Sequence, residues 1–184
     1  VAAQNDNKVV LVDLNEQMLE KSKSILAKIM NRLVEKEKLT SEQSETIQNN
    51  IQYSTDLNDF KDCEIVIEAI VENIDVKTKV FAEMEKITSE SCILASNTSS
   101  LSIASIGAAL ENPSRIIGVH FFNPAPLMPL VEVIPALQSR TELAEEMQVL
   151  MRQWGKQPAL AKDTPGFIVN RVARPYYGEA IRIL

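Results

Sequence analysis

The chain contains the sequence Ile116-Ile117-Gly118-Val119-His120-Phe121-Phe122-Asn123-Pro124, in which an apolar run ends in the only histidine of the protein. The apolar run predicts a buried strand over 115–119 that delivers the imidazole to its carboxyl end. The segment 130–134 predicts a return strand, and it places Glu132 twelve residues after His120. An imidazole titrates near neutrality and a carboxylate can orient it, so this pair is the first candidate for acid–base chemistry. A loop histidine bonded to the backbone is the alternative.

The segments before this stretch alternate between two kinds of pattern. Short apolar runs predict strands, and segments with apolar residues at helical spacing predict amphipathic helices. The predicted strands are 9–12, 51–53, 64–70 and 92–95, and the predicted helices are 16–38, 41–49, 76–87 and 101–110. Alternation of this kind indicates right-handed crossovers and an α/β fold with a mostly parallel sheet and helices on both faces.

The segments after Glu132 predict two further helices and a strand. Ser139 and Glu142 have the spacing of a capping box for a helix that ends near Trp154, where Gly155 would stop it. Residues 158–162 predict a last strand. Thr164 and Pro165 then read as the N-cap and first-turn proline of a helix that runs to Leu184.

The composition excludes several classes of protein. The 184 residues are 45% hydrophobic and 24% charged, and no apolar stretch approaches the length of a membrane helix. The formal charge of −6 argues against a nucleic-acid partner. Cys63 and Cys92 lie in apolar runs without metal-ligand spacing, which favours buried thiols in a reducing compartment over a disulfide or a zinc site. We expect a cytoplasmic protein with no metal and no membrane partner, although a targeting signal ahead of Val1 stays open.

Polar groups follow four of the predicted strands, where open α/β sheets bind their ligands. These groups are Asp13, Glu72, the segment 96–100 and His120. An acid that closes a strand after a nucleotide-binding helix grips the adenosine ribose and repels a 2′-phosphate, so Asp13 suggests NAD rather than NADP. The simpler alternatives are a turn aspartate at 13 and a helix cap at 96–100.

Taken together, these segments resemble the 3-hydroxyacyl-CoA dehydrogenase family over the whole chain. The resemblance rests on five ordered blocks, each quoted from this sequence: Val9-Val10-Leu11-Val12-Asp13, Glu68-Ala69-Ile70-Val71-Glu72-Asn73, Ser96-Asn97-Thr98-Ser99-Ser100-Leu101, the two stretches around His120 and Glu132, and Asp163-Thr164-Pro165-Gly166-Phe167-Ile168-Val169-Asn170-Arg171. It implies NAD-dependent oxidation of (S)-3-hydroxyacyl-CoA to 3-oxoacyl-CoA on a Rossmann-like domain, in fatty-acid or phenylacetate-type catabolism.

The resemblance also implies roles for individual residues. His120 would be the catalytic base and Glu132 its orienting partner, with Ser99 and Asn170 as hydrogen-bonding groups on the substrate side. The NAD-contacting positions would be Asp13, Glu72, Lys77, Ser99 and Asn123. Lys36 would meet the phosphates of coenzyme A, although a solvated surface lysine is the alternative, and the apolar Ile29 stands at another coenzyme A contact.

The chain departs from the family pattern at both ends. No glycine precedes Gly107, so the glycine-rich turn that approaches a pyrophosphate is not in this sequence. We expect an NAD-binding domain over 1–162 that lacks its first strand and turn. We expect the first helix of an all-helical domain, which would make a homodimer, over 163–184. A chain without these parts is expected to have little dehydrogenase activity.

Within the family, the segment 170–177 is most similar to bacterial enzymes that act on 3-hydroxyadipyl-CoA, with 3-hydroxybutyryl-CoA enzymes next. Arg174 could pair with a distal carboxylate of the acyl chain, and a surface arginine is the alternative. Two other readings of the function remain: a non-catalytic NAD-binding protein of the same fold, and another NAD-dependent acid dehydrogenase.

Overall fold

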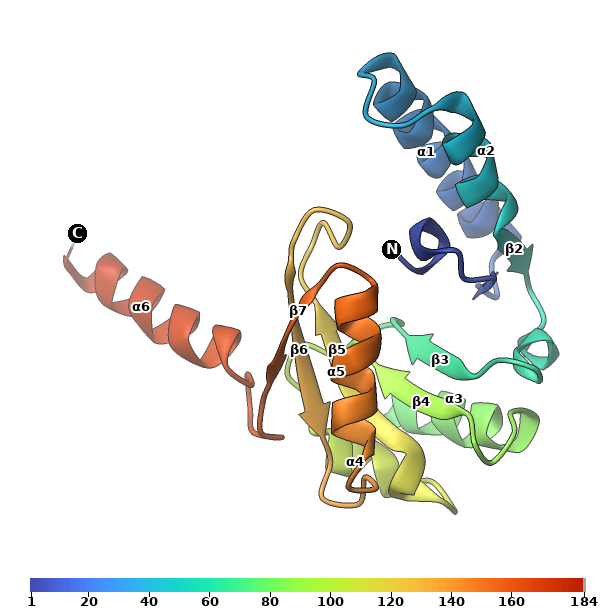
Figure 1. Cartoon of the computed structure of the whole chain (residues 1–184). Helices are drawn as coiled ribbons and strands as arrows, with labels where there is room; N and C mark the ends of the chain where they lie inside the picture. The colour runs from blue at the N-terminus through green and yellow to red at the C-terminus, as the bar shows by residue number, and fades with distance from the viewer. Residues whose placement is uncertain (184) are drawn as a thin grey trace. The chain divides into compact units, whose positions relative to one another are not determined.

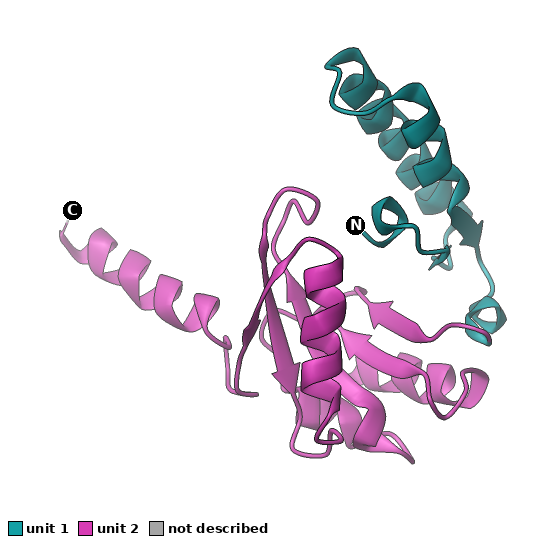
Figure 2. Ribbon diagram, in the orientation of Figure 1, with its two compact units in different colours: residues 1–61 teal, residues 62–184 magenta. Residues whose placement is uncertain are grey.

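The structure is a computed structural model that describes residues 1–183. The chain forms two compact units, Val1–Lys61 and Asp62–Leu184 (Figure 2). Leu184, in the second unit, lies outside the described residues. The last helix was predicted to end at this residue, so its predicted end also lies outside them.

The first unit is a helical hairpin on two strands. Its elements are η1 (Ala2–Asn5), β1 (Val9–Val12), α1 (Glu16–Glu35), α2 (Ser41–Asn49), β2 (Ile51–Ser54) and η2 (Leu57–Phe60). β1 and β2 pair in parallel, with Val9 opposite Ile51. The core centres on Ala3, Met30 and Ile47. Strand β1 was predicted to be buried, which is wrong: Leu11 is 38% exposed, because among residues 1–183 β1 pairs only with β2.

Helix α1 begins and ends by identifiable capping. The side chain of Asn15 accepts a hydrogen bond from the backbone of Gln17 at the start. At the other end Glu37 has φ of 54°, and the amide of Lys38 donates to the carbonyl of Leu33 at 2.9 Å. This left-handed turn satisfies the last carbonyls, so the helix ends at Glu35 instead of near Lys38 as predicted.

The second unit is a five-stranded sheet with helices on both faces (Figure 1). The strands are β3 (Ile65–Glu68), β4 (Ile93–Ser96), β5 (Ile116–Phe121), β6 (Leu130–Pro135) and β7 (Gln157–Leu160), and they lie in that order. β3, β4 and β5 are parallel, β6 returns antiparallel to β5, and β7 is parallel to β6. In Figure 1, α5 (Leu143–Gln153) lies in front of the sheet, and α3 (Ile74–Ile87) and α4 (Ile103–Gly107) lie behind it. The predicted α/β class and mostly parallel pairing are confirmed.

The core of this unit lies on both faces of its middle strands. Ile116, Ile117, Val119, Val131 and Val133 have no exposed surface. A strand covered on both faces requires a continuous apolar run, which is the pattern that the sequence showed. Among residues 1–183 no helix is both long and apolar enough to cross a membrane.

Helix α5 starts later than the predicted capping box requires. The hydroxyl of Ser139 accepts from the amide of Ala136 at 2.9 Å and donates to the carbonyl of Ile116 at 2.5 Å. It is therefore occupied by a turn, and Glu142 is the N-cap without a side-chain hydrogen bond. The predicted stop is confirmed, since Gly155 follows the helix with φ of 71°.

Helix α6 (Val169–Ile183) also begins later than predicted. Gly166 and Phe167 have φ of 78° and 48°, so neither can belong to a right-handed helix. The amide of Phe167 donates to the carbonyl of Thr164 at 2.9 Å, which closes a turn where the first helical turn was expected. Thr164 and Pro165 are thus part of a loop that leads to α6.

The close packing around Gly118 gives a test of the fold. A Cβ atom on Gly118 would lie 2.8 Å from Cδ1 of Ile103 and 3.0 Å from Cβ of Ile134. We expect Gly118→Ala to lower the free energy of unfolding by about 1–3 kcal/mol, the usual cost of overpacking a core. Urea unfolding measures this change. Gly178→Ala is the control, because nothing lies within 4 Å of that position in α6 and the helix should be slightly stabilised. Equal stability of the Gly118 variant and the parent would contradict the packing described.

Candidate active site

The second unit brings three of the predicted polar strand ends to one edge of its sheet. Strands β3, β4 and β5 are parallel neighbours, so the segments that follow them emerge side by side. Glu72 and Ser99 lie on the segments after β3 and β4, and His120 is the second-last residue of β5. His120 lies within β5, which extends to Phe121, instead of following the strand as predicted.

His120 and Glu132 form a buried pair across two antiparallel strands. They face each other in the register of β5 and β6, and Nδ1 of His120 is 2.7 Å from Oε2 of Glu132. The histidine is 5% exposed and the glutamate is fully buried. The imidazole ring lies 4.6 Å from the ring of Phe122 and 6.0 Å from that of Phe167, measured between centroids. The strand pairing therefore brings together the two side chains that the sequence spacing suggested as a pair.

The second oxygen of Glu132 is bound by the start of α6. Oε1 accepts hydrogen bonds from the backbone amides of Ile168 and Val169, each at 2.9 Å. An ionised carboxylate can only accept hydrogen bonds, so beside ionised Glu132 the proton shared with Oε2 is on Nδ1 of His120. Within residues 1–183, the hydrogen bond of His120 is at Nδ1, and Nε2 has no protein partner. The roles of these two amides were missed in the sequence, because a backbone donor leaves no side-chain signal.

Ser99 and Asn170 meet at the same edge. The side-chain amide of Asn170, in the first turn of α6, donates to the carbonyl of Ser99 at 3.1 Å. The amide of Ser99 donates to Oε1 of Glu72 at 3.0 Å. Within residues 1–183 no protein group bonds the exposed hydroxyl of Ser99. The structure thus joins three predicted site residues and leaves that hydroxyl available to a ligand.

Glu72 holds the turn that carries Ser99. In addition to the amide of Ser99, Oε1 accepts from the hydroxyl of Thr98 at 2.6 Å. Partial burial acts to raise the pKa of the Glu72 carboxyl, but the hydrogen bonds from Thr98 and Ser99 and the nearby charge of Lys77 outweigh it and hold this pKa below its usual range. The carboxyl is therefore ionised at neutral pH and accepts all of these bonds.

Lys77 and Asn123 occupy different environments. Lys77 is 1% exposed, with Nζ 2.6 Å from Oε1 of Glu68 and 3.3 Å from Oε2 of Glu72. Asn123 is exposed, on the loop between β5 and β6. The buried Lys156 holds this loop, since its Nζ donates to the carbonyl of Met128 at 3.0 Å, and burial lowers the pKa of that lysine. Glu68 and Lys156 were missed as site-building residues, because a charge in the sequence does not reveal its burial.

Two further predicted residues belong to the first unit. Asp13 follows β1 and is exposed, and its Oδ1 accepts from the amide of Asn15 at 2.8 Å. No hydrogen bond to its Oδ2 is present within residues 1–183, so that oxygen is available to a hydroxyl donor. Lys36 is the exposed C-cap of α1. Each side chain is thus accessible, as a ligand contact requires.

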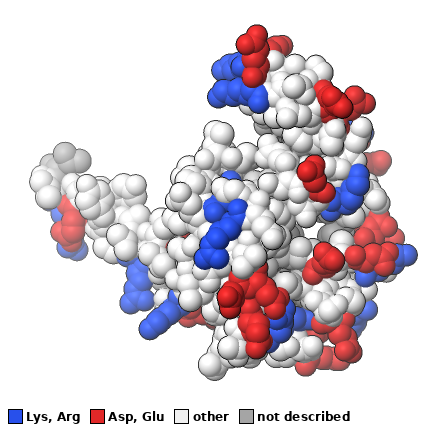
Figure 3. Space-filling model, viewed as in Figure 1, with Lys and Arg blue, Asp and Glu red and all other residues white. Residues whose placement is uncertain are grey.

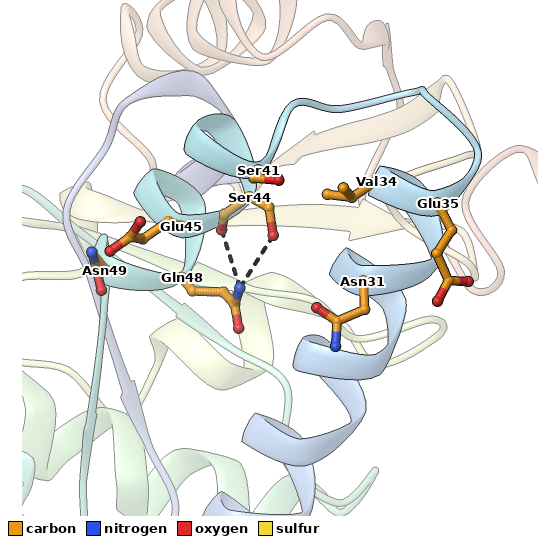
Figure 4. Close-up of a pocket in the computed structure, with 8 residues that line it drawn as sticks. All are labelled: Asn31, Val34, Glu35, Ser41, Ser44, Glu45, Gln48 and Asn49. Carbon is orange, nitrogen blue, oxygen red and sulfur yellow. Dashed lines mark hydrogen bonds between the residues drawn. The ribbon is translucent and has the colours of Figure 1, made fainter.

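The first unit also contains an open pocket of about 520 Å3 between α1 and α2 (Figure 4). Gln48 lies along α2, and its side-chain amide donates to the carbonyl and hydroxyl of Ser44 on the same helix at 3.2 and 3.3 Å. The lining includes two carboxylates and no cation, so it does not suit a phosphate group. Its residues are Asn31, Val34, Glu35, Ser41, Ser44, Glu45, Gln48 and Asn49, none of which is a predicted site residue.

In the described residues, neither the surface charge in Figure 3 nor a cluster of metal-binding side chains marks a ligand site. On the face shown in Figure 3, acidic and basic side chains lie next to each other over the second unit, so no large field of one sign covers that face. Within residues 1–183 no group of three His, Cys, Asp or Glu side chains is arranged to hold a metal ion.

Comparison with known proteins identifies the family. Residues 1–164 match the sequence model described as the 3-hydroxyacyl-CoA dehydrogenase NAD-binding domain. The chain is 42% identical to 3-hydroxyadipyl-CoA dehydrogenase of Escherichia coli K12, over all of this chain and 39% of the relative. It is 42% identical to a probable 3-hydroxybutyryl-CoA dehydrogenase of Deinococcus radiodurans, over 99% of this chain and 65% of the relative.

A solved structure extends the comparison to the fold. The structure of 3-hydroxybutyryl-CoA dehydrogenase from Escherichia coli K12 matches with a TM-score of 0.96 and 41% identity, over 98% of this chain and 38% of that one. The match supports a Rossmann-like fold followed by a helix. The chain spans less than two thirds of the length of both curated relatives. Over that span, the chain belongs to the 3-hydroxyacyl-CoA dehydrogenase family and contains its NAD-binding domain.

Proposed function

We propose that the protein oxidises (S)-3-hydroxyacyl-CoA to 3-oxoacyl-CoA with NAD. The observation that carries this proposal is the buried pair of His120 and Glu132, with Nδ1 and Oε2 2.7 Å apart and Nε2 left free. An orienting carboxylate on one ring nitrogen makes the other nitrogen a base, which is what removal of a proton from a secondary alcohol needs. Membership of the family supplies the type of substrate.

In this reaction the C3 hydroxyl loses its proton to Nε2 of His120, and C3 loses a hydride as the carbonyl double bond forms. Bound NAD supplies the acceptor for that hydride. By accepting this proton, His120 becomes an imidazolium, and Glu132 stabilises its positive charge through Nδ1. The backbone amides of Ile168 and Val169 keep the carboxylate in place, so the ring does not have to reorient during proton transfer.

The remaining site residues divide between the two ligands. We assign the free hydroxyl of Ser99 and the side chain of Asn170 to the oxygen atoms of the substrate. For NAD, the free Oδ2 of Asp13 would accept from a ribose hydroxyl. Glu72, Lys77, Ser99 and Asn123 complete the cofactor side, and the exposed ammonium of Lys36 would meet phosphates of coenzyme A. Within residues 1–183, the hydroxyl of Ser99 and Oδ2 of Asp13 have no hydrogen-bond partner, which supports their assignment to ligands.

The proposals for the acyl group, the assembly and the compartment use the names of the relatives, the surface of α6 and the two cysteines. The two curated relatives are named for 3-hydroxyadipyl-CoA and 3-hydroxybutyryl-CoA, so we propose short acyl chains, with or without a distal carboxylate that Arg174 could meet. Val172, Tyr176 and Ile183 expose 67%, 72% and 85% of their surface on α6, which supports a homodimer or further helices packed there. The free thiols of Cys63 and Cys92 support a reducing compartment such as the cytoplasm.

Replacement of the base tests the proposed reaction. We expect His120→Gln, made in an enzyme completed with the glycine-rich turn and the helical domain, to lower turnover of acetoacetyl-CoA reduction by about a hundredfold to ten-thousandfold, the usual worth of a positioned general acid or base. The Kd for NADH should stay nearly constant, because the variant keeps the cofactor residues. Steady-state kinetics and NADH fluorescence measure the two quantities. Turnover equal to that of the parent would remove His120 from the mechanism.

Cofactor choice tests the role of Asp13. We expect the parent to prefer NAD strongly over NADP, because a carboxylate repels the 2′-phosphate, and we expect Asp13→Ala to relax that preference. The ratio of kcat/KM for the two cofactors is the measurement. Glu35→Gln is the control, since this exposed carboxyl is the last residue of α1, at the opposite end of the helix from Asp13. Comparable efficiency of the parent with both cofactors would contradict the assignment.

A further inference from the structure

Phe167 has a backbone conformation that a phenylalanine rarely adopts. Its φ is 48°, and the preceding Gly166 has φ of 78°. Glycine takes positive φ freely, whereas a phenylalanine in this region brings its Cβ close to the following carbonyl oxygen. Such a conformation persists only where the surrounding contacts determine it, and it is found most often at functional sites. The proposed reaction assigns no role to this residue.

The loop that contains Phe167 is fixed on both sides of this residue. At the start of the loop, the carboxylate of Asp163 accepts hydrogen bonds from two backbone amides in the first turn of α4, at 3.0 and 2.8 Å. At its end, the amides of Ile168 and Val169 donate to Oε1 of Glu132, each at 2.9 Å. The contacts that determine the left-handed turn at Phe167 are therefore made by the chain before it and by the chain after it.

The side chain of Phe167 packs beside the proposed base. It is 3% exposed, and its ring centroid lies 6.0 Å from that of His120, with the two ring planes tilted by 58°. This separation and tilt are those of a direct aromatic contact. A hydrogen bond beside such an apolar ring is shielded from water, which strengthens the bond and slows exchange of its proton. The nearest hydrogen bond of the imidazole is the one from Nδ1 to Oε2 of Glu132, at 2.7 Å.

The turn at Phe167 thus serves both members of the buried pair. The ring of Phe167 contacts His120, and the amides of the next two residues bind the carboxylate of Glu132. Rotation about φ moves the side chain and the following amides together, relative to the loop before them. The same left-handed turn therefore sets the position of the ring and of the two amides.

We propose that Phe167 is a positioning residue for proton transfer: its left-handed turn and its buried ring hold His120 and Glu132 in place and keep water from the hydrogen bond between them. Phe167 acts through His120 and exchanges no proton itself. This inference rests on the proposed function for its assignment of His120 as the base. It differs from ordinary core packing, because loss of the ring should change the chemistry of His120 and not only the stability of the protein.

Proton exchange at Nδ1 of His120 tests the role of the ring. Phe167→Gly keeps the left-handed turn and removes the ring, whereas Phe167→Leu keeps a buried apolar side chain of similar size. We expect the Nδ1 proton to exchange with water at least about tenfold faster in Phe167→Gly, and within about threefold of the parent in Phe167→Leu. NMR of the 15N-labelled 184-residue chain, well below the melting temperature, measures this exchange.

Turnover tests the consequence for the reaction. In an enzyme completed with the glycine-rich turn and the helical domain, we expect Phe167→Gly to lower kcat for acetoacetyl-CoA reduction by about tenfold to a hundredfold, the cost of misplacing a catalytic group. The KM values for NADH and acetoacetyl-CoA should change by less than about threefold, because the ring acts on proton transfer and not on binding. Phe167→Leu should keep kcat within about threefold of the parent.

Phe81→Leu is the matched control, since it changes a fully buried ring on α3 that is neither of the two rings beside His120. It should lower stability and leave both the exchange rate and kcat near the parental values. A parental value of either quantity in Phe167→Gly, or an equal change in Phe81→Leu, would overturn the inference. If Phe167→Gly does not fold, the parent decides: nuclear Overhauser cross-peaks should join the ring protons of Phe167 and His120, and their absence would contradict the inference.

The two measurements separate this inference from the proposed function. Exchange at Nδ1 needs neither cofactor nor substrate, so fast exchange in Phe167→Gly together with a completed parent that does not reduce acetoacetyl-CoA would contradict the proposed reaction alone. A completed parent that reduces acetoacetyl-CoA, together with parental exchange and kcat in Phe167→Gly, would contradict the inference alone.

Discussion

The carboxylate of Glu132 is the interaction on which the rest of the site depends. One oxygen faces Nδ1 of His120 and the other accepts from the amides of Ile168 and Val169, so a single buried group orients the proposed base and caps α6. An uncompensated buried charge would be costly, and here each of the two carboxylate oxygens has a hydrogen-bond partner. The position of the sheet residue His120 and the start of the helix are therefore set together.

Other carboxylates of the second unit bind backbone amides in a similar way. Glu72 accepts from the backbone of Ser99, Glu68 from that of Ile70, and Asp163 from the amides of Ile103 and Ala104 at 3.0 and 2.8 Å. Loops at strand ends have backbone donors that no ladder satisfies, and an ionised side chain is a strong acceptor for them. The site is built from turns that carboxylates hold in place.

The sequence predicts the alternation of strands and helices and the pair His120 and Glu132, because both depend on local pattern and on strand register. It fails where a side chain has a competing partner. Ser139 bonds a turn instead of capping α5, and the loop before α6 contains Phe167 in a left-handed conformation. The buried pair of Glu68 and Lys77 is equally invisible, since burial depends on contacts between elements far apart in the chain.

The protonation of the single histidine tests the central claim most directly. Because His120 is the only histidine of the chain, its imidazole nitrogens give the only such signals in a 15N-labelled, untagged sample. The structure predicts that neutral His120 carries its proton on Nδ1, shared with Glu132, and that Nε2 is unprotonated and available as the base. Long-range 1H–15N correlation spectra distinguish the two tautomers. A neutral imidazole with its proton on Nε2 would contradict the account.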